Sequence, residues 1–147
     1  MALAVSNFLA DKILNGVFRG QSYTFPTTVY VALYTSNPTA ADTGTEVSGG
    51  SYARRSVAFN APVSENAEIY NPETGNLITV SRRTVKNNAE IRFPEATANW
   101  NLITHVGIRD ALTGGNLLYY GAIKYPKTIN VADLMKFSIG DVVLTLN

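Results

Sequence analysis

From residue 28 onward, apolar side chains recur at every second position in short segments, and this alternation limits the fold more than any other feature. The segment TVYVALYTS (28–36) is rich in β-branched and aromatic residues, and both of its alternating sides are largely apolar. Such alternation is typical of a β-strand, and two apolar sides predict a strand that is buried on both faces. The chain therefore has to build a sheet whose faces are covered.

Further strand-like segments follow and are separated by turn-forming Gly, Pro and Asn residues. They are 51–59, 67–93 (divided around the turn NPETGN), 103–110, 116–124, 127–131 and 134–147. About eight strands at this spacing, without alternating helices, predict a mainly β fold of the antiparallel β-sandwich type, jelly-roll-like or immunoglobulin-like. A chain of 147 residues is expected to form one domain, 1–147.

The first 20 residues have a different, helical periodicity. It predicts one amphipathic helix over 3–19, with Ser6 as a candidate cap for an internal start and Gly20 as a candidate stop. The apolar face is broad for so short a helix. Two interpretations stay open, because this face either covers the protein's own sheet or docks on another subunit. The candidate interface residues on it are Phe8, Leu9, Ile13, Leu14 and Phe18.

The segment THVGIRDALTGGNLLYYG (104–121) contains the only histidine, His105, together with Arg109 and Asp110. Strand alternation places His105 and Arg109 on one face, the wetter one, and about 13 Å apart at four strand rises. Asp110 is expected to accept hydrogen bonds in the following turn, where two glycines supply positive φ angles. The segment therefore predicts a β-hairpin and not the corner of an active site.

Other templates for chemistry are incomplete. The sequence has no G-x-S-x-G motif and no cysteine, and one histidine cannot supply a metal site of the usual kind. In the loop 37–50, turn capping or weak cation binding is expected for Asp42 and Glu46. Glu90 and Glu95 are expected to be solvated and not a glycosidase pair. We expect no enzyme, no cofactor and no metal site.

The charge balance also limits the partners. The chain has 12 Lys+Arg against 11 Asp+Glu, which predicts no nucleic-acid partner. No apolar run approaches the roughly 20 residues that span a bilayer, so no membrane partner is expected. The opening residues lack the features of a signal peptide, and the absence of cysteine is compatible with synthesis in a reducing cytosol.

A few side chains remain as candidates for surface contacts. Trp100 either plugs the end of the sandwich or stacks on a sugar or a partner. Tyr119 and Tyr120 point to opposite faces of a strand, and Tyr120 is the candidate contact residue. Arg82 and Arg83 belong either to an exposed hairpin or to a charge-complementary contact with a neighbouring subunit.

Three segments together carry a family resemblance: VSNFLADKILNGVFRG; TTVYVALYTSNPTAADTGTEVSGGSYARRSV; and NNAEIRFPEATANWNLITHVGIRDALTGGNLLYYGAI followed by PKTINVADLMKFSIGDVVLTL. They resemble small virion proteins of tailed bacteriophages that are often labelled tail fibre proteins. The resemblance covers most of the chain and implies a non-enzymatic, mainly β virion component, with no functional residues to carry over. The segment 64–86 is longer than the family's usual connection and is expected to be an inserted hairpin.

This resemblance leads to two hypotheses. The first is a capsid decoration (cement) protein, which binds and stabilises the assembled shell, commonly as a trimer. The alternative is a tail or tail-fibre component, either an adaptor or a receptor-binding tip, because the chain lacks the heptads or repeats of a fibre shaft. The expected partners are the major capsid protein or neighbouring virion proteins, and a homo-oligomer is expected, with a trimer favoured. The protein is expected on the capsid surface or the tail, after synthesis in the host cytoplasm.

Overall fold

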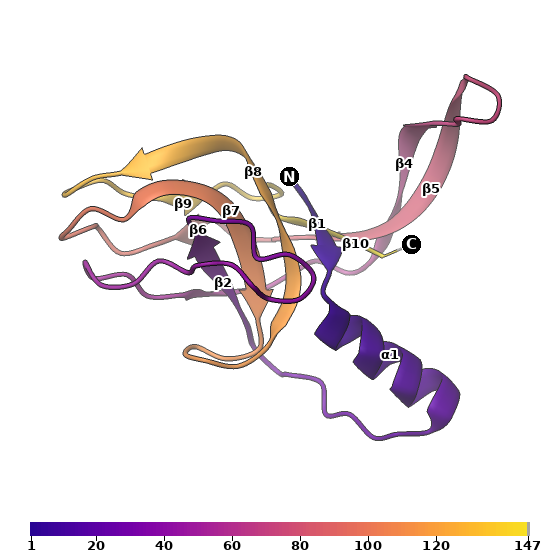
Figure 1. Cartoon of the computed structure of the whole chain (residues 1–147), viewed down its shortest axis with the longest axis horizontal. Coiled ribbons are helices and arrows are strands. Elements are labelled where there is room, and N and C mark those ends of the chain that lie inside the picture. Colours follow the sequence, from indigo (N-terminus) through magenta and orange to yellow (C-terminus); the bar gives the residue numbers. More distant parts are fainter. Residues whose placement is uncertain (147) are drawn as a thin grey trace.

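The computed structural model describes residues 1–146 and shows a mainly β protein with one helix, as expected (Figure 1). Asn147, the last residue of the expected strand 134–147, lies outside the described residues. The elements are β1 (Ala2–Val5), α1 (Asn7–Arg19), β2 (Val29–Tyr34), β3 (Arg55–Val57), β4 (Val63–Tyr70), β5 (Leu77–Lys86), β6 (Ile91–Arg92), β7 (Asn101–Arg109), β8 (Leu117–Ile129), β9 (Lys136–Phe137) and β10 (Val143–Leu146).

Eight of the strands form one curved sheet in the order β3-β2-β7-β8-β1-β10-β5-β4, and β6 pairs with β9 in a small second sheet. The pair β1–β10 is parallel, and the other pairs are antiparallel. The expected strands 116–124 and 127–131 are one strand, β8. Its pairing with β7 jumps from Lys127 to Ala122, so Pro126 lies in an irregularity where its missing N–H costs no ladder bond.

The core lies between the large sheet and the small β6–β9 sheet. Val31 and Leu33 of β2 are fully buried in the main apolar cluster, together with residues of both sheets. The other face of β2, with Ala32 and Tyr34, is buried in a second cluster around Leu117. The prediction that this strand is covered on both faces is therefore confirmed.

The helix is shorter than the expected range 3–19, because residues 2–5 form β1. Leu3 is buried in the core, and β1 pairs with β10 through its first half and with β8 through its second half. These tertiary pairings outweigh the local helical pattern. The caps are as expected: the Ser6 side chain accepts a hydrogen bond from the Leu9 N–H, and Gly20 adopts the left-handed conformation at φ 65°.

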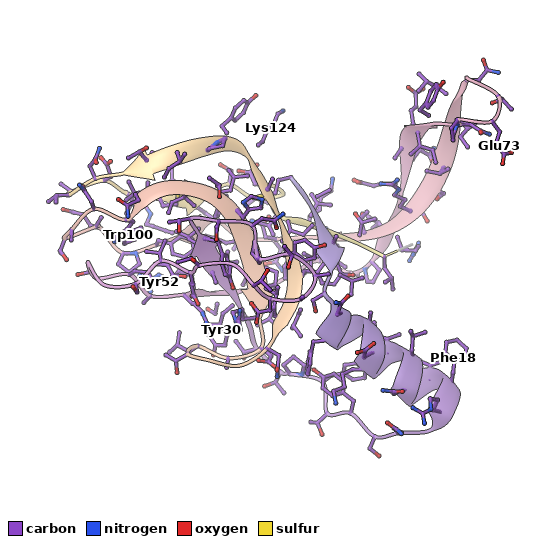
Figure 2. All side chains as sticks on the ribbon, in the orientation of Figure 1. Phe18, Tyr30, Tyr52, Glu73, Trp100 and Lys124 are labelled. Carbon is purple, nitrogen blue, oxygen red and sulfur yellow. The ribbon has the colours of Figure 1, made fainter. Side chains whose placement is uncertain are left out.

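Two elements project from the body, namely α1 and the β4–β5 hairpin (Figure 1). The hairpin has continuous pairing from Val63↔Thr84 to Tyr70↔Leu77, and only the base of β5 pairs further, with β10. Figure 2 shows Phe18 on α1 and Glu73 at the hairpin tip, both far from the core. Residues 1–146 contain no helix with the length and hydropathy needed to cross a membrane.

Candidate interaction surface

Asp42, in the long loop between β2 and β3, forms a bidentate ion pair with Arg109 at 2.9 and 2.8 Å. Arg109 also donates to the Tyr34 hydroxyl at 2.8 Å and to the Gly115 carbonyl at 3.0 Å. Desolvation acts to lower the pKa of Arg109, but the hydrogen bonds with Asp42 and Tyr34 outweigh it and raise that pKa. The expectations of a turn cap or a cation site at Asp42, and of a wet face for Arg109, are therefore wrong. The loop folds over this face of β7 and covers it.

A second ion pair joins the same loop to the neighbouring turn. Arg54 donates to the two carboxylate oxygens of Glu46 at 2.8 and 2.7 Å and to two carbonyls of the turn 110–116 at 2.7 Å each. The Tyr52 hydroxyl donates to Glu46 at 2.8 Å and accepts from the Leu33 N–H at 3.0 Å. Burial and the Glu46 carboxylate raise the pKa of Tyr52. We call these two ion pairs with their tyrosines the loop clasp; Glu46, too, is part of it and not a turn cap or cation ligand.

The segment 104–121 forms the expected hairpin. The Asp110 carboxylate accepts from the Asn116 backbone N–H at 2.7 Å, and the two glycines have φ angles of 60° and 71°. His105 is partly buried beside Thr104, at 2.8 Å between Nδ1 and Oγ1, and burial lowers its pKa. In the described part of the chain, no three His, Cys, Asp or Glu side chains gather in a way that would hold a metal ion.

Trp100 is buried and closes one end of the core. Its Nε1–H donates to the Gly50 carbonyl at 2.9 Å, and its ring meets Tyr52 edge to face at 5.5 Å. A Cβ at Gly50 would lie 2.9 Å from this nitrogen, so the close approach requires glycine there. The alternative in which Trp100 stacks on a sugar or a partner is wrong, because its side chain is 2% exposed.

The helix α1 presents an uncovered apolar face. All of α1 lies within the described residues, and none of its side chains is fully buried. Phe8 and Leu9, at the end near the body, pack partly against the core. Farther out, Leu14, Val17 and Phe18 are 55%, 69% and 76% exposed.

An apolar groove of about 570 Å³ runs between α1 and the segment that follows it. Tyr23 contacts Phe8 and Phe25 edge to face at 6.1 and 5.3 Å, and Phe25 is 70% exposed. The apolar residues that line the groove are Ile13, Val17, Tyr23, Phe25 and Leu146.

Leu146 of β10 also lines a second apolar groove, of about 250 Å³, at the base of the hairpin. Its other lining residues include Pro62, Arg83, Val85 and Leu144. Since both grooves share Leu146, they form one apolar region between the two projections. We call this region, together with the exposed apolar side chains of α1, the α1–hairpin surface. Its grooves are lined by Ile13, Val17, Phe25, Leu146 and Arg83, whereas Leu14 and Phe18 are exposed on α1 and line neither groove.

The structure brings some of the candidate interface residues together and separates others. Ile13 and Arg83 line the grooves of the α1–hairpin surface, and Leu14 and Phe18 are exposed elsewhere on α1, whereas Phe8 and Leu9 pack partly against the core. Two candidates lie apart from this surface. Arg82 faces Glu65 across the hairpin, on the side opposite to Arg83, and Tyr120 packs against the second core cluster.

Sequence reasoning missed Phe25 and Leu146. Phe25 lies in the short segment QSYTFPTT (21–28), which shows no periodicity, and Leu146 continues the alternation of a strand. Neither position carries a local signal of exposure, because their common neighbourhood depends on where α1 and β10 lie in the fold.

A comparison with models of known protein families finds a family that matches nearly the whole chain. Residues 4–145 match the model described as Podophage GP4 fiber I protein gp80. A search of curated proteins finds no match to the chain. The family match confirms the resemblance to fibre-labelled phage proteins and covers α1, the body and the hairpin. The protein thus belongs to the Podophage GP4 fiber I protein gp80 family, and it is a fibre-related structural protein of a bacteriophage virion.

Proposed function

We propose that this protein is a non-enzymatic component of the phage tail fibre and that it attaches to a neighbouring virion protein through the α1–hairpin surface. The observation that carries the proposal is the amphipathic helix α1, of which no side chain is fully buried within the described structure. A helix of 13 residues is marginal on its own in water, because most helical stability in proteins comes from packing of the apolar face. A partner that covers this face supplies the missing packing.

The energetics support a protein partner. Burying the exposed parts of Leu14, Val17 and Phe18 would contribute about 1–2 kcal/mol for each side chain. A standard interface covers roughly 800 Å² per partner, which is more than three side chains provide. The two grooves add apolar surface toward the hairpin. Arg83 lines the groove at the base of the hairpin and Arg19 lies in the last turn of α1, so the partner is expected to carry acidic residues.

The hypothesis of a capsid decoration protein relies on the same surface, since a cement protein also covers apolar surface when it binds the assembled particle. We favour the tail because the matching family is described as a fibre protein. The position of the protein in the particle separates the two hypotheses.

The test uses a phage from which the gene for this protein is deleted, while a plasmid supplies the wild-type or variant protein in trans. The amount of the protein in purified virions is then measured. Leu14→Asp and Phe18→Asp alter exposed positions of α1, so both variants are expected to fold as the wild type does but to be lost from purified virions. Val131→Asp and Ile139→Asp are matched controls, because these apolar residues are 61% and 68% exposed on the body. They are expected to be incorporated normally.

Immunogold labelling of wild-type particles provides the location. Label on the tail supports the proposal, whereas label on the shell contradicts it and favours decoration. Normal incorporation of both α1 variants would show that this surface does not mediate attachment.

A further inference from the structure

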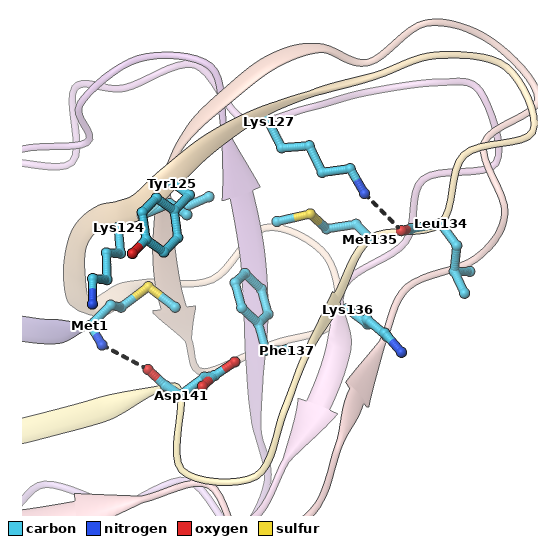
Figure 3. A pocket seen from close by; sticks show the side chains of 10 residues that line it. Met1, Lys124, Tyr125, Lys127, Leu134, Met135, Lys136, Phe137 and Asp141 are labelled. Carbon is cyan, nitrogen blue, oxygen red and sulfur yellow. Dashed lines mark hydrogen bonds between the residues drawn. The ribbon is translucent and has the colours of Figure 1, made fainter.

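A basic pocket lies on the body, between β8, the segment around β9 and the N-terminal Met1. It has a volume of about 520 Å³, and its rim carries Lys124, Lys127 and Lys136 (Figure 3). Tyr125, which is 75% exposed, and Leu134 form an apolar wall. Pockets of this size are large enough to hold a drug-sized ligand or a few side chains. We call it the lysine pocket.

The lysine pocket has an excess of positive charge. In the described part of the chain, none of its three lysines forms an ion pair. Lys127 reaches only the Leu134 carbonyl, at 3.5 Å, and the Lys124 ammonium lies 5.3 Å from the centre of the Tyr125 ring. The one carboxylate that lines the pocket, Asp141, accepts a hydrogen bond from the Ser138 N–H at 2.9 Å. The pocket therefore suits an occupant that is both anionic and apolar.

The tip of the β4–β5 hairpin has the complementary character. Residues 66–81 contain two glutamates, Glu68 and Glu73, and no Lys, Arg or His. Tyr70 and Leu77 pair directly across the strands and are 63% and 65% exposed. They share a face with Glu68, because side chains two residues apart on a strand point the same way. The tip thus combines two carboxylates with two apolar groups.

The tip has a defined shape that a pocket can recognise. The N–H of Asn71 donates to the Asn76 carbonyl, and the N–H of Gly75 donates to the Asn71 carbonyl, both at 2.8 Å. The Asn71 side chain accepts from the Glu73 N–H at 2.9 Å. However, a hairpin of two strands is only marginally stable in water without further packing. Contact with another surface would stabilise the projecting part.

From this complementarity we infer that the hairpin tip of one copy binds in the lysine pocket of a second copy. The hairpin projects from its own body (Figure 1), and Figure 2 places Glu73 at its tip far from Lys124 of the pocket, so the contact joins two copies and not two parts of one. It joins two different surfaces, and such a head-to-tail contact produces a closed ring or an open chain of copies. This contact does not involve α1 and is independent of the attachment proposed above.

The experiment measures molar mass by sedimentation as a function of concentration. The tip variant is Glu68→Gln/Glu73→Gln/Leu77→Ser, and the pocket variant is Lys124→Gln/Lys127→Gln/Lys136→Gln. The wild type is expected to form oligomers that dissociate at high salt, since the contact is largely ionic. In each variant the dissociation constant is expected to rise by about 30-fold or more.

A mixture of the two variants tests the head-to-tail geometry. The tip variant keeps an intact pocket and the pocket variant keeps an intact tip, so an equimolar mixture is expected to form dimers and nothing larger. The matched controls are Glu90→Gln/Glu95→Gln and Arg55→Gln/Arg92→Gln, which remove exposed charges outside the tip and the pocket. Both are expected to assemble as the wild type does.

Three results would overturn the inference. One is a wild-type protein that stays monomeric up to a concentration of about 1 mM; a dissociation constant of that size corresponds to a standard free energy of binding of about −4 kcal/mol. Another is an oligomer that the tip and pocket variants retain. The third concerns an acidic glycan: the wild type binds a polyuronate such as polygalacturonate, and the pocket variant loses this binding but keeps the oligomer. The occupant of the pocket would then be a glycan and not the hairpin tip.

Discussion

Phe93 and Phe18 are the same side chain in opposite surroundings. Phe93 is 1% exposed and packs against Tyr52 and Phe137 in the core, whereas Phe18 is 76% exposed at the outer part of α1. The core follows the usual rule for large apolar side chains, and the helix breaks it. The difference indicates that the body provides stability while the projections keep apolar surface for contacts with other proteins.

The charged residues show the same contrast. Arg109 is buried and shares two hydrogen bonds with Asp42, so it fastens a long loop to the sheet. Arg83 lies exposed on the hairpin and donates to Ser64 Oγ at 2.8 Å and to the Pro62 carbonyl at 3.2 Å. The first arginine maintains the fold, and the second remains accessible to a partner.

The largest effect on stability is expected from Phe93→Ala. Removing a fully buried aromatic ring leaves a cavity and should lower the free energy of unfolding by about 3–5 kcal/mol. Urea denaturation followed by circular dichroism measures this loss. A loss below about 1 kcal/mol would mean that the core between the two sheets is not packed as described.

The second-largest loss in the free energy of unfolding is expected from Arg109→Met. It leaves the Asp42 carboxylate and the Tyr34 hydroxyl without their partner, and breaking a buried pair costs about 3–5 kcal/mol. Because the Asp42 side chain is 35% exposed, we expect the lower end of this range. The same urea titration measures it, with the exposed Arg55→Met as a control that should change stability little. Equal effects of the two substitutions would show that the Asp42–Arg109 pair adds nothing to stability.

Alkaline pH should lower the free energy of unfolding by a smaller amount. The raised pKa of Tyr52 means that the folded state favours the neutral phenol. This stabilisation is fully present below the unfolded pKa of about 10 and is lost as pH rises above it, by up to about 1.4 kcal/mol per pH unit. Urea midpoints between pH 8 and 11 test this. Tyr52→Phe should show a shallower fall than the wild type, and identical slopes would contradict the assignment to Tyr52.

The smallest change is expected from Phe18→Ala, the counterpart of Phe93→Ala. The ring is exposed, so the free energy of unfolding should change by no more than about 0.5 kcal/mol. The measurement is the same urea titration of the isolated protein. A loss comparable to that of Phe93→Ala would show that α1 folds back on the body, and the contrast between the two regions would fail.

Features that depend on neighbours in the sequence could be predicted. Alternation predicts β2 and its two buried faces, and Gly20 indicates the end of α1, whereas Ser6 is expected only as a cap for an internal start although the helix begins directly after it. The turn after β7 was also recognisable, because Asp110 and the two glycines have specific backbone roles. Each of these signals lies within a few residues of the structure that it determines.

Features that depend on distant residues could not be predicted in the same way. Residues 2–5 become a strand only because β8 and β10 flank them. Asp42 and Arg109 pair across 67 residues of sequence, and only the path of the loop brings them together. Likewise, the α1–hairpin surface exists because Leu146 lies beside α1, and no periodicity indicates that proximity.

Ser6 joins α1 to the body and, with the Asn7 N–H that donates to the Ala40 carbonyl at 2.9 Å, holds the direction in which the helix leaves. The buried Ser6 donates through its N–H to the Leu118 carbonyl and through its hydroxyl to the Leu117 carbonyl, at 2.9 and 2.5 Å. The helix beyond it is 13 residues long, or about 20 Å. A tilt of about 10° at this junction would move the far end by about 3 Å, so the hydrogen bonds that anchor the start of α1 control the angle at which a bound neighbour would be held.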